Sequence, residues 1–196
     1  MSENKSAKKQ KQMAVSIAIL EIIEKEGLLG VTHSKVSRRS KVSRAWIYEY
    51  IGKERAALVE FGAEVFGSHI ARAELPATPK TKAELERQLN EGVEFLFESL
   101  AASPVLIKLY FRFRGAPNSI GNVIQKYEKK WLNNASKAAA EVLSLDADQA
   151  ELLAETILTL RLGFAHRFAT SDNPKLTLKR ARKVFEHIHS MIGAVD

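Results

Sequence analysis

The stretch "THSKVSRRSKVSRAWIYEY" (residues 32–50) decides which fold this sequence predicts. It contains five Lys and Arg residues, and its only carboxylate is Glu49. Thr32 and Ser43 stand where the N-caps of two short helices are expected, because a hydroxyl oxygen there accepts a free backbone N–H of the first turn. The pattern therefore predicts one short helix ending at residue 39, a short connection, and a second helix over residues 44–50.

A longer amphipathic helix is predicted ahead of the basic stretch, over residues 11–26. Its apolar side chains recur every three or four positions, at Val15, Ala18, Ile19, Ile22 and Ile23. A charged start followed by an apolar run also occurs in secretory signal peptides, but three glutamates interrupt this run and no small-residue cleavage site follows. We therefore interpret the segment as a core helix that packs across the two short ones.

These three helices match the plan of a helix-turn-helix domain, in which the second short helix enters the DNA major groove. Apolar residues that can close a small core are Val36, Val42, Ile47 and Ile51. Residues predicted to face bases or phosphates are Thr32, Ser34, Lys35, Ser43, Arg44, Ala45, Trp46, Tyr48 and Tyr50. Arg44 is the candidate for paired hydrogen bonds to guanine, a contact that contributes about 1–3 kcal/mol of discrimination.

The net charge of +7 is concentrated near the start of the chain. Residues 1–60 contain twelve Lys and Arg against seven Asp and Glu, whereas residues 61–196 contain eighteen against sixteen. A local basic surface favours a polyanionic partner, although a solvated charged face is the plain alternative. A basic membrane-surface helix would need a wide apolar face, and the few apolar residues here are needed inside. Residues 1–12 are predicted to form a flexible basic arm, which either adds phosphate attraction or is inert.

The rest of the chain predicts helices only, and thus an all-α fold. A helix over residues 53–73 precedes the break "LPATPK", and apolar residues at helical spacing follow it over residues 85–100. "PVLIKLYFRFRG" is expected to be helical, although its F-R-F-R alternation would also suit a strand. Three further helices are expected over residues 120–142, 147–169 and 175–192.

No catalytic, metal or cofactor site is predicted. The chain has no cysteine, which excludes disulfides and thiolate ligands and fits a reducing cytoplasm. His187 and His189 are two residues apart, so a helix directs their rings to diverging sides, which makes them a poor metal pair. Sequence motifs for phosphate loops, zinc hydrolases and dinucleotides are missing, and no apolar run is long enough to span a membrane.

The ordered spacing of the basic segment resembles the tetracycline-repressor (TetR) family of bacterial transcription regulators. The matching residues are Ile19-Leu20, Gly27, Val31-Thr32, Val36-Ser37, Ser40-Lys41-Val42-Ser43, Ile47-Tyr48, Tyr50-Ile51 and Lys53-Glu54. The resemblance implies an N-terminal three-helix helix-turn-helix DNA-binding domain at residues 13–52. It also implies a larger helical domain at residues 53–196 that binds an effector and dimerises. The resemblance further implies that Lys53 contacts a DNA phosphate.

Four positions depart from the family pattern. Lys41 replaces the usual turn glycine, so a left-handed backbone there would be strained by about 1 kcal/mol. Ser37 and Ser40 replace small apolar residues, and Trp46 is bulkier than the usual residue, which fits either a DNA contact or packing within its own domain. The "YIGKE" ending is also one residue short, which weakens the assignment of Lys53.

The resemblance further implies a homodimer that binds a palindromic DNA operator and is released by a small-molecule effector of unknown identity. Dimer contacts are expected at Leu153, Ile157, Leu160, Phe164, Val184, Phe185 and Ile188 on the last two helices. The effector pocket is expected at Val93, Phe97, Leu106, Tyr110, Phe113, Tyr127, Trp131 and His166. The alternative is a non-enzymatic architectural or protein-interaction module of the same fold, which lacks specific operator recognition.

Overall fold

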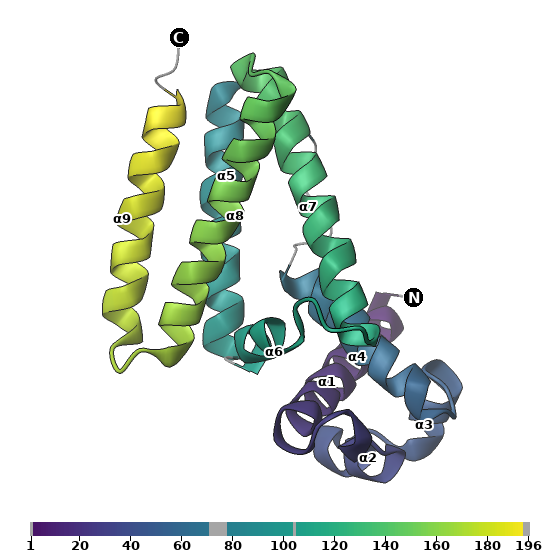
Figure 1. The fold of residues 1–196 in the computed structure, drawn as a ribbon. Helices are drawn as coiled ribbons and strands as arrows, with labels where there is room; N and C mark the ends of the chain where they lie inside the picture. The colour runs from purple at the N-terminus through teal and green to yellow at the C-terminus, as the bar shows by residue number, and fades with distance from the viewer. Residues whose placement is uncertain (1, 71–77, 104, 194–196) are drawn as a thin grey trace. The chain divides into compact units, whose positions relative to one another are not determined.

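The computed structural model describes residues 2–70, 78–103 and 105–193, which form nine α-helices and one 3-10 helix and contain no strand. The elements are α1 (Ser2–Glu26), η1 (Leu28–Gly30), α2 (His33–Ser40), α3 (Arg44–Tyr50), α4 (Arg55–Ile70), α5 (Lys82–Ala102), α6 (Val105–Phe113), α7 (Ser119–Leu143), α8 (Ala147–Thr170) and α9 (Pro174–Gly193) (Figure 1). The predicted all-α fold class is confirmed. None of these helices combines the length and the apolar character that crossing a membrane requires.

The chain divides into two compact units. The first unit comprises Met1–His69 and Lys108–Gln125, and the second comprises Ile70–Ile107 and Lys126–Asp196. The first unit is larger than the segment 13–52, because it also includes α4 and parts of α6 and α7. The functional boundary after residue 52 stays a prediction.

Helix α1 begins at Ser2, so the expected start near residue 11 is wrong. Its first three turns are polar and lack an apolar period, which is why the sequence pattern did not reveal them. The predicted mobility of residues 1–12 stays a prediction. Further along, the expected apolar face is buried, at Val15, Ala18, Ile19, Ile22 and Ile23.

Other helices of the first unit pack closely against α1. A Cβ atom on Gly62 of α4 would lie 2.6 Å from Cγ2 of Ile19, so only glycine allows this approach. Arg112 of α6 donates from Nη1 to the carbonyl oxygen of Glu24 at 3.2 Å. The helical interpretation of "PVLIKLYFRFRG" is confirmed over residues 105–113, and the predicted helix over residues 53–73 is described as α4, with residues 71–73 outside the described part.

The turn between α2 and α3 explains three of the departures from the family pattern. Lys41 has φ 58° and ψ 21°, the left-handed conformation that glycine adopts without strain. The hydroxyl of Ser37 donates to the Val42 carbonyl oxygen at 2.7 Å, and the Val42 N–H donates to Oγ of Ser40 at 3.2 Å. Two serine hydroxyls therefore hold the strained turn in place, which apolar residues could not do.

In the second unit, helices α5, α8 and α9 lie side by side, and α7 contributes to the same core (Figure 1). One buried cluster is formed by Leu85, Leu89, Trp131, Ala138, Ala139, Leu143, Ala150, Ala154 and Ile157. A second cluster is formed by Val93, Phe97, Ala181 and Phe185. Glu94 of α5 and Arg182 of α9 form a two-pronged ion pair, with Nε–Oε1 at 2.7 Å and Nη2–Oε2 at 2.5 Å, and this hydrogen bonding lowers the pKa of Glu94.

A polar cluster is buried within this second unit. Arg161 is 8% exposed, donates to the Leu89 carbonyl oxygen at 2.7 Å, and lies 5.2 Å from the ring centre of Trp131. His189 is fully buried, and its Nδ1 bonds to Oδ1 of Asn90 at 2.5 Å. Burial, with the nearby positive charge of Arg161, lowers the pKa of His189 to about 4.

We expect His189 to make the protein less stable as the pH falls from about 6.5 to about 4. The unfolded chain takes up the proton at the ordinary pKa, whereas the folded chain excludes it until about pH 4. The stabilisation is thus complete above pH 6.5, and roughly 2–4 kcal/mol is lost below that window. Urea unfolding of His189→Gln should show a flatter pH dependence, and the exposed neighbour His187→Gln should behave like the wild type. Equal slopes for all three proteins would contradict the assignment.

The strained turn makes a separate prediction about stability. Lys41→Gly should raise the free energy of unfolding by up to about 1 kcal/mol, because relief of the left-handed strain exceeds the extra chain entropy of glycine in the unfolded state. Lys41→Ala removes the same charge but keeps the Cβ atom, so it serves as the control. If denaturant unfolding finds the glycine variant no more stable than the alanine variant, the strain at residue 41 is not significant.

Candidate nucleic-acid interface

The two short helices begin with the caps that the sequence predicts. Thr32 Oγ1 accepts the Lys35 N–H at 3.3 Å, and Ser43 Oγ accepts the Trp46 N–H at 3.3 Å. Both caps have extended backbone conformations, as N-caps require. The predicted ranges of α2 and α3 are thus confirmed to within a residue at each end.

The side chains beneath α3 fix which face it presents. Val36 and Ile47 are fully buried and Val42 is nearly so, which confirms the predicted small core. Ile51 is only half-buried, because it follows the last turn of α3 and lies at the edge of this core. A seven-residue helix held by one buried isoleucine exposes most of its other side chains.

The outward face of α3 carries the residues predicted to meet DNA. Arg44 and Ala45 are exposed, and Tyr48 and Tyr50 are 39% and 42% exposed. Arg44 donates from Nη1 to Oγ of Ser34 at 3.4 Å, which links the start of α3 to the start of α2. The structure thus brings Ser34 and Arg44 together, although they are ten residues apart in the sequence.

His33 is a positioning residue that sequence reasoning missed. Its Nε2 bonds to the Gly52 carbonyl oxygen at 2.9 Å, so the beginning of α2 is tied to the turn that follows α3. Its ring also lies 4.6 Å from the ring of Tyr48, at an interplanar angle of 51°. The only sequence signal was a histidine directly after a helix cap, which is too common to identify this role.

Trp46 packs within its own unit. Its ring lies 4.8 Å from the ring of Tyr50, and the ammonium of Lys11 lies 5.9 Å from its ring centre. The ammonium of Lys8 lies 4.4 Å from the ring centre of Tyr50. A hydrogen bond to Glu49 and the charge of that carboxylate raise the pKa of Tyr50.

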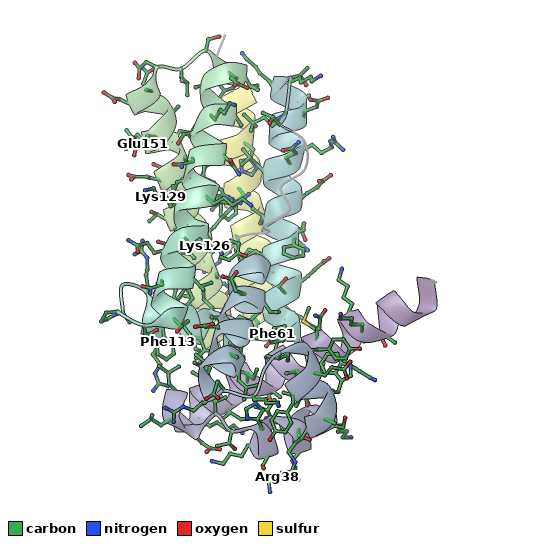
Figure 2. All side chains as sticks on the ribbon, turned by 90° about the vertical axis from the view of Figure 1, so that its right-hand side faces the viewer. Arg38, Phe61, Phe113, Lys126, Lys129 and Glu151 are labelled. Atoms are coloured by element: carbon green, nitrogen blue, oxygen red, sulfur yellow. The ribbon has the colours of Figure 1, made fainter. Side chains whose placement is uncertain are left out.

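Ion pairs reduce the positive charge of α2, whereas Arg44 of α3 is paired with no carboxylate of the described residues. Lys35 pairs with Glu26 and Arg39 pairs with Glu21, both acids being on α1. The positive charge of Lys35 is therefore partly neutralised. Arg38 extends away from the ribbon (Figure 2) and, like Lys41, Arg44 and Lys53, is exposed.

The predicted effector-pocket residues are divided between the two units. Tyr110 and Phe113 belong to the first unit, and the other six belong to the second. Val93, Phe97, Leu106 and Trp131 are buried and Tyr127 is half-buried. His166 is exposed on its helix, and its role in an effector pocket stays a prediction.

The second unit also contains an open groove along α5. Its volume is about 690 Å³, and it is lined by Ala83, Glu86, Arg87, Asn90, Glu91, Glu94, Phe95 and Glu98. None of the predicted pocket residues lines it. Within the described part of the chain, no group of His, Asp or Glu side chains gathers in a way that could hold a metal ion.

The predicted dimer residues differ in their exposure. Val184 is 36% exposed, and Leu153, Leu160, Phe164 and Ile188 are half-buried. Ile157 and Phe185 are 3% and 1% exposed, so they are already covered by their own unit and offer no surface to a second chain. Helical periodicity could not distinguish the face that packs inside the unit from the face that is open to solvent, because both carry apolar residues. Leu152 and Met191 lie on the same two helices and are 66% and 50% exposed.

Comparison with known proteins gives structural matches only. No protein-family model and no curated protein matches the sequence. A proposed TetR-family transcriptional regulator from Rhodococcus sp. has a TM-score of 0.60 at 13% identity, with 95% of this chain and 100% of that chain covered. A proposed TetR-family regulator from Syntrophomonas wolfei has a TM-score of 0.62 at 15% identity, with 95% and 96% covered.

A third solved structure is similar to the same extent. It is a proposed fatty acid metabolism regulator from Clostridium perfringens, with a TM-score of 0.64 at 16% identity and coverage of 93% and 99%. Identities this low establish the fold and nothing finer. Together with the capped α2 and α3 described above, they show that this chain has the fold of the TetR-family transcriptional regulators.

Proposed function

We propose that this protein is a sequence-specific DNA-binding transcription regulator whose α3 reads the major groove. One observation carries the proposal: α3 is capped by Ser43 and held by the buried Ile47, and it turns Arg44 outward at its first position. In a helix-turn-helix domain, the N-terminal residues of the second helix meet the base edges. Arg44 is suited to guanine, because a guanidinium forms paired hydrogen bonds to O6 and N7.

Phosphate contacts support the same docking. The first turn of α2 has backbone N–H groups at its N-terminus and no acidic residue, so this end of the helix favours an anion. Ser34 and the exposed Lys53 can add hydrogen bonds to neighbouring phosphates. Tyr48 is 39% exposed, and the contact of its ring with His33 limits how the side chain can turn.

The proposed regulator acts as a homodimer, so that each α3 has a second copy of α3 beside it on the DNA. The apolar residues Leu152, Val184 and Met191 are exposed on α8 and α9, and burying them would favour association. Two copies related by a two-fold axis would place their α3 helices about one DNA turn apart and would match a palindromic operator. A small-molecule effector bound in the helical body would lower operator affinity and release the repressor.

The decisive experiment compares two DNA duplexes. The protein should bind a duplex from the region upstream of its own coding sequence, or one selected from a random pool, at least about 1,000-fold more tightly than a random duplex at equal salt. Equal affinities would favour the architectural alternative, because phosphate contacts alone do not distinguish sequences.

Arg44→Ala should reduce the preference for the operator over a random duplex by roughly 5- to 150-fold, which corresponds to about 1–3 kcal/mol. Binding to the random duplex should change much less, because base contacts are absent there. Arg38→Ala removes an exposed cation from α2 and is the matched control; it should leave the preference unchanged. A preference that survives Arg44→Ala would remove this residue from the base contacts.

A further inference from the structure

The first turns of α1 extend beyond the small core of the first unit. Along α1 the buried face contains Val15, Ala18 and Ile19. Stepping back three or four residues along the same face reaches Lys11 and then Lys8, because residues at this spacing lie above one another on a helix. Where the apolar face of α1 ends, the same side of the helix therefore carries two lysines.

These two lysines lie against the reading helix. Lys8 is 4.4 Å from the ring centre of Tyr50, and Lys11 is 5.9 Å from the ring centre of Trp46. The two rings are themselves neighbours, with centres 4.8 Å apart and an interplanar angle of 32°. A cation over an aromatic face is attracted by the ring quadrupole, so these contacts hold the beginning of α1 beside α3.

The contacts with the rings leave the positive charge of both lysines available. An aromatic ring has no net charge, and within the described chain neither ammonium is paired with a carboxylate. The later turns of α1 behave in the opposite way, since Glu21 and Glu26 neutralise Arg39 and Lys35 of α2. The glutamates of α1 thus neutralise two cations of α2, whereas the lysines of α1 place two positive charges beside α3.

We infer that the beginning of α1, residues 2–12, is a second DNA-contacting element, in which Lys8 and Lys11 bind phosphates that flank the groove occupied by α3. This inference rests on the proposed function, because it requires α3 to lie on DNA. The chemistry is charge complementarity: exposed ammonium groups meet the phosphate backbone and release its counterions. The element adds affinity for any duplex and no preference for a sequence.

The test is the salt dependence of DNA binding by the full-length protein. The double variant Lys8→Gln/Lys11→Gln should reduce the slope of log affinity against log salt by about 1.8, since each phosphate contact contributes about 0.9. Affinity should fall by the same factor for the operator and for a random duplex, so their ratio stays unchanged. Glutamine has nearly the helix propensity of lysine, so α1 is preserved, which circular dichroism can check.

Two controls separate position from charge. Lys129→Gln/Lys179→Gln removes two exposed charges from the second unit, where Lys129 points away from the helices (Figure 2), and should keep the wild-type slope. Lys8→Arg/Lys11→Arg keeps both charges and both ring contacts and should also keep it.

Two results would overturn the inference. An unchanged slope in Lys8→Gln/Lys11→Gln would show that the element does not touch DNA, and a tighter complex would show that it covers α3 instead. Failure of the proposed function looks different, because the wild type itself would then bind the operator and the random duplex equally.

Discussion

Burial of Ile47 is the interaction on which the exposed face of α3 depends. Helix α3 has seven residues, which is too short for a helix to be stable in isolation, so tertiary packing must hold it. Once Ile47 is inside with Val36 and Val42, helical geometry turns Arg44, Ala45 and Tyr48 outward together. The cap by Ser43 and the bond from His33 to Gly52 then fix the two ends of α3. The surface is therefore a consequence of the small core beneath it.

The turn between α2 and α3 shows how a departure from a family pattern can be compensated. A lysine in a left-handed conformation costs free energy that glycine would not. Ser37 and Ser40 accompany Lys41, and each forms a hydrogen bond with the backbone of Val42. Viewed one at a time, the three substitutions weaken the resemblance. In the structure the three residues act together, because the hydrogen bonds of the two serines stabilise the turn in which Lys41 is strained.

Charge is distributed by α1 in a way that composition cannot reveal. The basic stretch contains five cations, but two of them are paired with glutamates of α1. The lysines at the beginning of the same helix lie over the rings of α3. One helix thus neutralises two cations of α2 and places beside α3 two lysines that pair with no carboxylate of the described residues, which makes the position of the charges more informative than the net value of +7.

Local sequence signals determined the all-α class, both helix caps, the range of α3 and three residues of the small core, Val36, Val42 and Ile47. The reason is that the hydrogen bonds of a cap and the periodicity of a helix depend on residues a few positions apart. Tertiary structure alone decided what depends on distant residues. Ser34 meeting Arg44, His33 reaching Gly52, and Lys8 and Lys11 covering the rings of α3 all require helices to fold back on one another. The burial of Ile157 and Phe185 within their own unit also depends on distant residues. Helical periodicity shows which residues share an apolar face, but it does not show which neighbour covers that face. The polar first turns of α1 carry no period at all, so only the folded chain shows them to be helical.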